Sequence, residues 1–124
     1  MRLVLIESPY AAPTPEGIAR HVAYVRAAMA DCFQRGEAPW ASHATYTAVG
    51  VLDDTKPDER RLGIEAGLAW GSRADATVAY VDLGVTRGMQ QGIDRAAAEG
   101  RPVEVRTLPA DVLARVMATG VVSQ

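Results

Sequence analysis

Residues 78–98 read VAYVDLGVTRGMQQGIDRAAA and combine the signals of a strand, a turn and a helix. Residues 78–82 are a β-branched and aromatic run of the kind found in buried strands, residues 83–88 contain two glycines and a threonine, and residues 89–98 carry apolar side chains at helical spacing. In an open parallel sheet, ligands bind beyond the carboxyl ends of the strands, where free helix N–H groups face an anion. The stretch therefore predicts part of a ligand site in an α/β fold.

The turn itself offers four candidate contacts. Asp82 is predicted to end the strand and to meet sugar hydroxyls, by analogy with the acidic strand-end residues of dinucleotide sites. Thr86 is placed to cap the helix, Gly88 would allow a ligand to approach the first turn closely, and Arg87 could add a charge-assisted bond to an anion. This arrangement suits a sugar that carries a phosphate or a carboxylate. A turn with the same residues and no ligand is the alternative.

Working outward, strand and helix signals alternate along the chain. The predicted strands lie at residues 2–7, 38–41, 78–82 and 103–106, and the predicted helices at residues 15–35, 57–71, 87–98 and 108–117. This order predicts a single three-layer α/β domain over residues 1–119, with a mostly parallel sheet of four to five strands and helices on both faces. Residues 120–124 are expected to be a flexible tail, and the alternation at residues 103–106 indicates an edge strand.

Composition limits the classes of function. The chain has 124 residues and a formal net charge of −2, and it shows no basic stripe, so nucleic acid is not an expected partner. No apolar run is long enough for a membrane span and no signal-peptide pattern is present, so we expect a cytoplasmic protein. Cys32 is the single cysteine and is expected to be a buried, inert thiol. No spacing resembles a metal-ligand set, and no cofactor is expected.

Small residues at four-residue spacing mark two predicted helices. They are Gly63, Gly67 and Gly71 in one helix and Gly88, Gly92 and Ala96 in the other. Each interior glycine costs about 1 kcal/mol relative to alanine, so these positions need a compensating reason. The two stripes could pack backbone to backbone, within the chain or across a subunit contact, or they could form a floor on which a flat ring lies.

Two loops supply further candidates. Residues 8–15 contain three prolines and form a candidate wall of the site, and residues 42–54 form a long connection of the kind that is often functional. His43 in the second loop is a candidate ligand contact, together with hydrogen-bonding neighbours in the same loop. His21 lies beside the apolar face of a helix and is interpreted as structural or solvated.

Three local patterns together carry a family resemblance. They are Ser8-Pro9-Tyr10 after the first strand, Leu68-Ala69-Trp70 followed by Ala74-Asp75-Ala76, and Asp82 followed by residues 84–89. Over residues 2–108 the chain resembles the nucleoside 2-deoxyribosyltransferase superfamily, and more closely the short uncharacterised phage and bacterial proteins grouped near it. The resemblance implies a Rossmann-like domain that binds a nucleoside or nucleotide, commonly as a homodimer or larger homo-oligomer.

The resemblance also implies an activity, but the expected carboxylates are missing. Enzymes of that superfamily cleave the N-glycosidic bond with a glutamate nucleophile and a helping aspartate. In this sequence the glutamate would fall at Gly92 and the aspartate at Gly67. The leading hypothesis is therefore a protein that binds a nucleoside, a nucleotide or a related metabolite without cleaving it. The alternatives are an N-glycosidase or deoxyribosyltransferase that acts on a nucleoside monophosphate through Glu65 or Asp82, and a non-catalytic protein whose glycine stripes build a homo-oligomer.

The candidate site can be stated residue by residue. The resemblance places Tyr10 along the sugar or base, and Ser8 beside it in the wall of the pocket. The full set of predicted ligand contacts is Ser8, Tyr10, His43, Gly67, Asp82, Thr86, Arg87, Gly88, Met89 and Gly92. The candidate catalytic carboxylates are Glu65 and Asp82.

Overall fold

Four parallel strands form one sheet in the order β2-β1-β3-β4. In the computed structural model, which describes residues 1–119, the strands are β1 (Arg2–Glu7), β2 (Glu37–Trp40), β3 (Ala76–Tyr80) and β4 (Val103–Arg106). The chain leaves β1 toward β2 on one side and later adds β4 on the other side of β3. The strand order therefore reverses between β1 and β3, and a sheet of this kind binds ligands outside the carboxyl ends of those strands.

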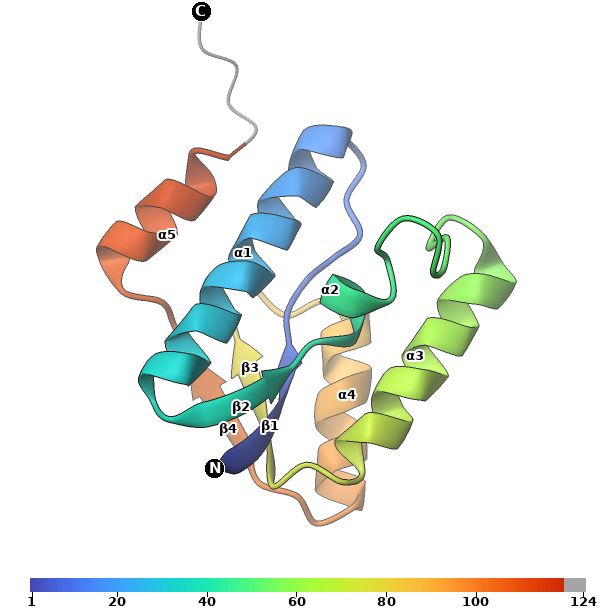
Figure 1. Ribbon diagram of the computed structural model, residues 1–124, viewed down its shortest axis with the longest axis vertical. Helices are drawn as coiled ribbons and strands as arrows, with labels where there is room; N and C mark the ends of the chain where they lie inside the picture. The colour runs from blue at the N-terminus through green and yellow to red at the C-terminus, as the bar shows by residue number, and fades with distance from the viewer. Residues whose placement is uncertain (120–124) are drawn as a thin grey trace, which may run out of the picture.

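Helices cover both faces of this sheet and complete the three layers expected of the α/β class. They are α1 (Pro15–Gln34), α2 (Ser42–Thr45), α3 (Pro57–Gly71), α4 (Arg87–Ala98) and α5 (Ala110–Met117). Figure 1 shows α1 and α5 on one side of the strands and α3 and α4 on the other. The side chains of Val4, Ile6, Val78 and Tyr80 alternate toward α1 and α5 and form the main hydrophobic core with them.

The predicted starts of two helices are confirmed by their caps. The side chain of Thr14 accepts a hydrogen bond from the backbone N–H of Gly17 at 3.1 Å, and Pro15 occupies the first turn of α1. The side chain of Thr86 likewise accepts from the N–H of Met89 at 3.2 Å at the start of α4. Among the described residues, no helix has the length and hydropathy needed to cross a membrane.

Several boundaries differ from the sequence prediction. β2 begins and ends one residue earlier than predicted, β3 begins two residues earlier, at Ala76, and α1 ends one residue earlier, at Gln34. β3 ends at Tyr80 instead of residue 82, because the N–H of Asp82 donates to the Tyr24 hydroxyl at 2.9 Å instead of continuing the ladder. The loop predicted at residues 42–54 contains the short helix α2, and α5 starts two residues later than expected. The predicted tail at residues 120–124 lies outside the described residues.

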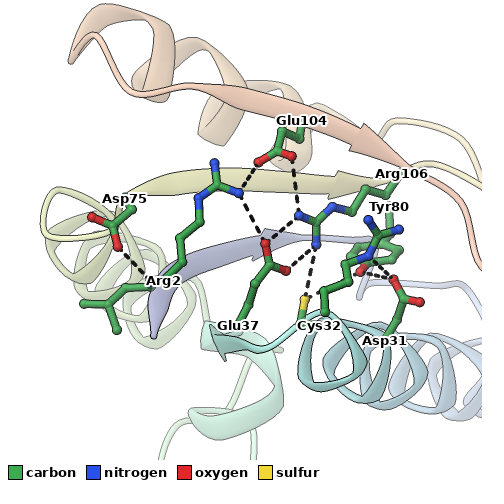
Figure 2. Close-up of polar contacts among 10 residues, drawn as sticks. Arg2, Asp31, Cys32, Glu37, Asp75, Tyr80, Glu104 and Arg106 are labelled. Carbon is green, nitrogen blue, oxygen red and sulfur yellow. Dashed lines mark hydrogen bonds and ion pairs between the residues drawn. The ribbon is translucent and has the colours of Figure 1, made fainter.

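A network of charged and polar side chains is buried between the sheet and α1 (Figure 2). The Arg106 guanidinium binds both carboxylate oxygens of Glu37, at 2.7 Å and 2.8 Å. It also donates to the Cys32 sulfur at 3.7 Å, and burial raises the pKa of that thiol, which agrees with the predicted inert role. The Tyr80 hydroxyl donates to Asp31 at 2.6 Å. This network ties both edge strands to α1 and β3.

Candidate functional site

A cavity of about 300 Å³ opens at the carboxyl end of β1, between α2, α3 and the start of α4. It lies at the reversal of strand order, where an open α/β sheet binds its ligands. Nine of the predicted ligand contacts line it, namely Ser8, Tyr10, His43, Gly67, Thr86, Arg87, Gly88, Met89 and Gly92. Four segments that are distant in sequence are thus brought to one place.

Asp82 and Glu65, the two predicted catalytic carboxylates, are not among the lining residues. The Asp82 carboxylate accepts hydrogen bonds from the Tyr24 hydroxyl at 2.7 Å and from the N–H of Leu108 at 3.0 Å. It therefore anchors the loop after β3 to α1 and to the segment before α5. Glu65 is exposed on α3.

Glu7 is a cavity residue that the sequence interpretation did not single out. It is the last residue of β1, and its carboxyl group lies against Gly92 of α4, so closely that a Cβ atom at position 92 would overlap it. Burial raises the pKa of Glu7 to about 8, and the positive charge of Arg101 offsets only part of this rise. The carboxyl group is therefore mostly protonated at pH 7. The sequence signal that could have pointed to Glu7 is an acidic residue at the end of a predicted buried strand.

The relation between Glu7 and Gly92 changes how the missing carboxylates are interpreted. The resemblance places a glutamate at position 92, where this chain has glycine. The structure places the carboxyl group of Glu7 in the space that the first atom of such a side chain would need. The cavity thus contains a buried carboxyl group after all, supplied by β1 instead of α4.

Ser8, Tyr10 and His43 form a connected wall beside Glu7. The Ser8 hydroxyl lies 2.9 Å from His43 Nε2, and the rings of Tyr10 and His43 pack with their centroids 5.8 Å apart. Burial, with a smaller contribution from His21, lowers the pKa of His43 to about 4, so its imidazole is neutral at pH 7. A neutral wall of hydroxyl, imidazole and aromatic groups suits an uncharged sugar or base.

His21 holds this wall from outside and does not line the cavity. Its Nδ1 atom donates to the backbone carbonyl of Tyr10 at 2.7 Å. This contact positions the loop after β1, as the structural interpretation of His21 expected.

The first turn of α4 forms another part of the cavity lining. The N–H of Met89 is capped by Thr86, whereas the N–H groups of Arg87 and Gly88 make no hydrogen bond among the described residues and lie at the positive end of the dipole of this 12-residue helix. Arg87 is exposed there and makes no ion pair with the described residues, whereas the Arg60 guanidinium is bound to Asp54 at 2.7 Å. Within residues 1–119 there is no group of side chains that would hold a metal ion. This part of the cavity is suited to a phosphate or carboxylate.

The glycines of α3 serve close packing within the chain. A Cβ atom at Gly67 would lie 2.8 Å from both Cβ and Oγ of Ser42, and one at Gly71 would lie 2.7 Å from a methyl group of Leu5. Gly63 and Gly67 also line the cavity. The stripe therefore allows α2 and β1 to pack close to α3, which confirms the packing interpretation within the chain. It also leaves part of the cavity lining without side chains, and the binding of a flat ring there stays a prediction.

Gly67→Ala is expected to lower the free energy of unfolding by about 1 kcal/mol. Overpacking of this kind costs about 1–3 kcal/mol, and the gain in helix propensity of about 1 kcal/mol offsets only part of it. Urea unfolding measures the change. Gly88→Ala is the matched control, because its nearest new contact would be the Thr86 hydroxyl at 4.0 Å. Equal stability of the two variants would contradict close packing at Gly67.

The comparisons with known proteins agree with this architecture. The chain superposes on a 2-deoxyribosyltransferase from the psychrotolerant bacterium Bacillus psychrosaccharolyticus with a TM-score of 0.59 and 15% sequence identity, over 98% of this chain and 77% of that one. At this identity the likeness establishes a shared fold. No curated protein matches the sequence. Residues 2–106 match the model of a family described as a domain of unknown function, DUF7768, and the chain therefore belongs to this family.

Proposed function

We propose that the cavity binds a nucleoside or a nucleotide. The observation that carries this proposal is the combination, in one cavity lining, of neutral hydroxyl, imidazole and aromatic groups from the loop after β1 and from α2 with the first turn of α4. A nucleotide likewise combines a neutral sugar and base with a phosphate. The shared fold supports the proposal, because the superposed neighbour is described as a catalyst for the synthesis of nucleosides.

The lining residues suggest how such a ligand would lie. The rings of Tyr10 and Tyr46 provide flat surfaces for a base, and Ser8 provides a hydroxyl group for the sugar. A phosphate would then face the amides of α4 and the guanidinium of Arg87. The volume of about 300 Å³ is at the lower end of ligand pockets, which favours a single nucleoside or mononucleotide over a dinucleotide.

The two alternatives differ in their support. The catalytic alternative loses its two sequence-derived carboxylates, since Glu65 and Asp82 do not line the cavity, and it now depends on Glu7. The assembly alternative loses its main support, because the glycines of α3 pack against Ser42 and Leu5 of the same chain and are not left for a subunit contact. A homodimer, which the family resemblance implies, is compatible with ligand binding, and sedimentation velocity would measure it separately.

Binding is tested by titrating the protein with nucleosides and their 5′-monophosphates in a calorimeter, with thermal unfolding measured in parallel. A ligand at 100 times its dissociation constant should stabilise the fold by about 2.7 kcal/mol. We expect the monophosphate to bind more tightly than its nucleoside, and Arg87→Gln to remove most of that difference. Absence of binding and of any thermal shift across the panel would overturn the proposal.

Gly88→Leu is expected to weaken binding of the best ligand by about tenfold or more without destabilising the fold. Gly88 lies at the cavity rim, and only the Thr86 hydroxyl lies within 4.0 Å of a Cβ built there. A leucine would therefore meet the ligand and not the protein, and the loss of one or two well-made contacts corresponds to about 1.4 kcal/mol or more. Calorimetry measures the affinity and thermal unfolding the stability. Unchanged affinity would show that the ligand binds elsewhere.

A further inference from the structure

We infer that Glu7 determines the specificity of the cavity, because the O–H of its carboxyl group donates a hydrogen bond to an uncharged acceptor on the nucleoside part of the ligand. This acceptor is a hydroxyl oxygen of the sugar, or a carbonyl oxygen or ring nitrogen of the base. The inference rests on the proposed function for the class of ligand. It goes further because it assigns a ligand contact, and the proton that makes it, to the end of β1.

The carboxyl group of Glu7 has a fixed place in the cavity lining. Glu7 ends β1, which lies between β2 and β3 in the sheet, and it is in register with Ala79 of β3. Its side chain reaches the backbone of α4 at Gly92, where an added Cβ atom would overlap the carboxyl group. The strand therefore fixes the backbone of Glu7, and the glycine gives its side chain room beside the helix.

The position of Gly92 also relates this carboxyl group to the unpaired amides of α4. The N–H groups of Arg87 and Gly88 make no hydrogen bond among the described residues. Gly92 follows Gly88 by about one helical turn, or about 6 Å along the helix axis. A phosphate at the first turn would thus leave Glu7 facing the part of the ligand next to the phosphate, which is the uncharged nucleoside.

Glu7 has no protein partner for its hydrogen bonds. Among the described residues its carboxyl group makes no hydrogen bond or ion pair, although it is largely buried. The other two acidic residues of the lining are engaged, since Asp54 is bound by Arg60 at 2.7 Å and Glu59 accepts from the N–H of Asp53 at 3.1 Å. Glu7 is therefore the lining carboxyl group whose hydrogen bonds are left for a ligand.

The same surroundings keep the proton on Glu7. A buried carboxylate without a hydrogen bond or an ion pair loses its hydration without compensation, so the neutral form is favoured. Burial accordingly raises the pKa of Glu7 to about 8, and the positive charge of Arg101 offsets only part of the rise. A protonated carboxyl group has one O–H to donate and can accept at its other oxygen. It therefore matches an uncharged polar group of the ligand.

Other acidic and basic groups lie around the cavity, and a pH profile must separate them from Glu7. They are Arg101 behind Glu7, Asp54, Glu59 and Arg60 from the loop and α3, and Arg87 on α4, together with His43, Tyr10 and Tyr46. His43, whose pKa is lowered to about 4, is already neutral above pH 6. Glu7→Gln keeps all these groups and removes only the ionisable one at position 7. The difference between the two profiles therefore belongs to Glu7.

Calorimetric titrations with nucleosides of the common bases and with their 5′-monophosphates test the hydrogen bond at pH 7. Glu7→Gln keeps an N–H donor and an oxygen acceptor, so it should bind within about threefold of wild type. Glu7→Met has a similar length but no donor, and it should weaken binding by about tenfold or more, because the acceptor of the ligand is left unpaired. Glu65→Gln makes the amide change on the exposed face of α3, outside the cavity, and should match wild type.

The pH dependence of binding is a second measurement, and for wild type it needs no variant. Wild-type affinity should be level from about pH 6.5 to 7.5 and should fall above about pH 8, as Glu7 loses its proton. The decrease approaches about tenfold per pH unit, since only the protonated fraction binds well. Glu7→Gln should not show this decrease.

Deoxynucleosides identify which acceptor Glu7 contacts. If it is a sugar hydroxyl, the 2′-deoxy or 3′-deoxy ligand that lacks this group should bind equally to wild type and to Glu7→Met. If it lies on the base, both deoxy ligands should bind Glu7→Met more weakly than wild type. Equal binding of every ligand by wild type and Glu7→Met, or identical pH profiles for wild type and Glu7→Gln, would overturn the inference and leave the proposed function intact. Absence of binding to wild type would remove both.

Discussion

Arg106→Leu is expected to lower the free energy of unfolding by about 3–5 kcal/mol, because it leaves the Glu37 carboxylate buried without its main partner. Glu37 is 5% exposed and receives two hydrogen bonds from Arg106, which hold the pKa of that carboxyl group below its usual value. Arg2 is the remaining partner of Glu37. Its guanidinium lies 3.3 Å from the Glu37 carboxylate and is exposed to solvent. It can compensate only in part.

Urea unfolding near pH 7 measures this change, and two further variants define its origin. Arg115→Leu makes the same substitution in an exposed pair with Asp111 at 3.5 Å, and it should change stability by less than about 0.5 kcal/mol. The double variant Arg106→Leu with Glu37→Leu should be more stable than Arg106→Leu alone, because no buried charge remains unpaired. A double variant as unstable as the sum of its single changes would contradict this explanation.

The sequence predicted the fold well where local signals agree. The bounds of α3 follow from Pro57 at its start and Gly71 at its end, and β4 was placed at the correct residues as an edge strand. Helix α2 was missed because its four residues are too few to show a period. The end of β3 was misplaced because Tyr24, which draws the backbone of Asp82 out of the ladder, is 58 residues away in sequence.

The candidate site was predictable only in part from the sequence. The turn at residues 84–89 was recognised because its glycine and threonine signals are local, and most predicted contacts meet in one cavity. Glu7 was missed because its significance comes from Gly92, 85 positions further along the chain, and no spacing rule links the end of a strand to a helix so distant. The structural role of Asp82 was missed for the same reason, since Tyr24 and Leu108 donate hydrogen bonds to its carboxylate only in the folded chain.

Glu7 should also make the protein less stable as the pH rises, and Glu7→Gln should remove that dependence. In the unfolded chain this carboxyl group ionises near its ordinary pKa of 4.5, whereas in the folded protein it keeps its proton to about pH 8. Between these values the folded state binds more protons, so the free energy of unfolding falls as pH increases. At about 1.4 kcal/mol per pKa unit, the full effect is on the order of 5 kcal/mol above pH 8.

The titration of His43 changes the free energy of unfolding with pH in the opposite direction. It therefore determines the pH range over which the effect of Glu7 can be measured. Its pKa falls from 6.5 to about 4 on folding, so stability rises with pH between these values and offsets the decline due to Glu7. Wild type should therefore change little from pH 5 to 6.5 and lose stability from pH 6.5 to 8. Glu7→Gln should gain stability from pH 5 to 6.5 and then stay level, as urea unfolding at each pH would measure. Parallel curves for the two proteins would show that Glu7 is ionised in the folded state, and they would contradict the raised pKa of its carboxyl group.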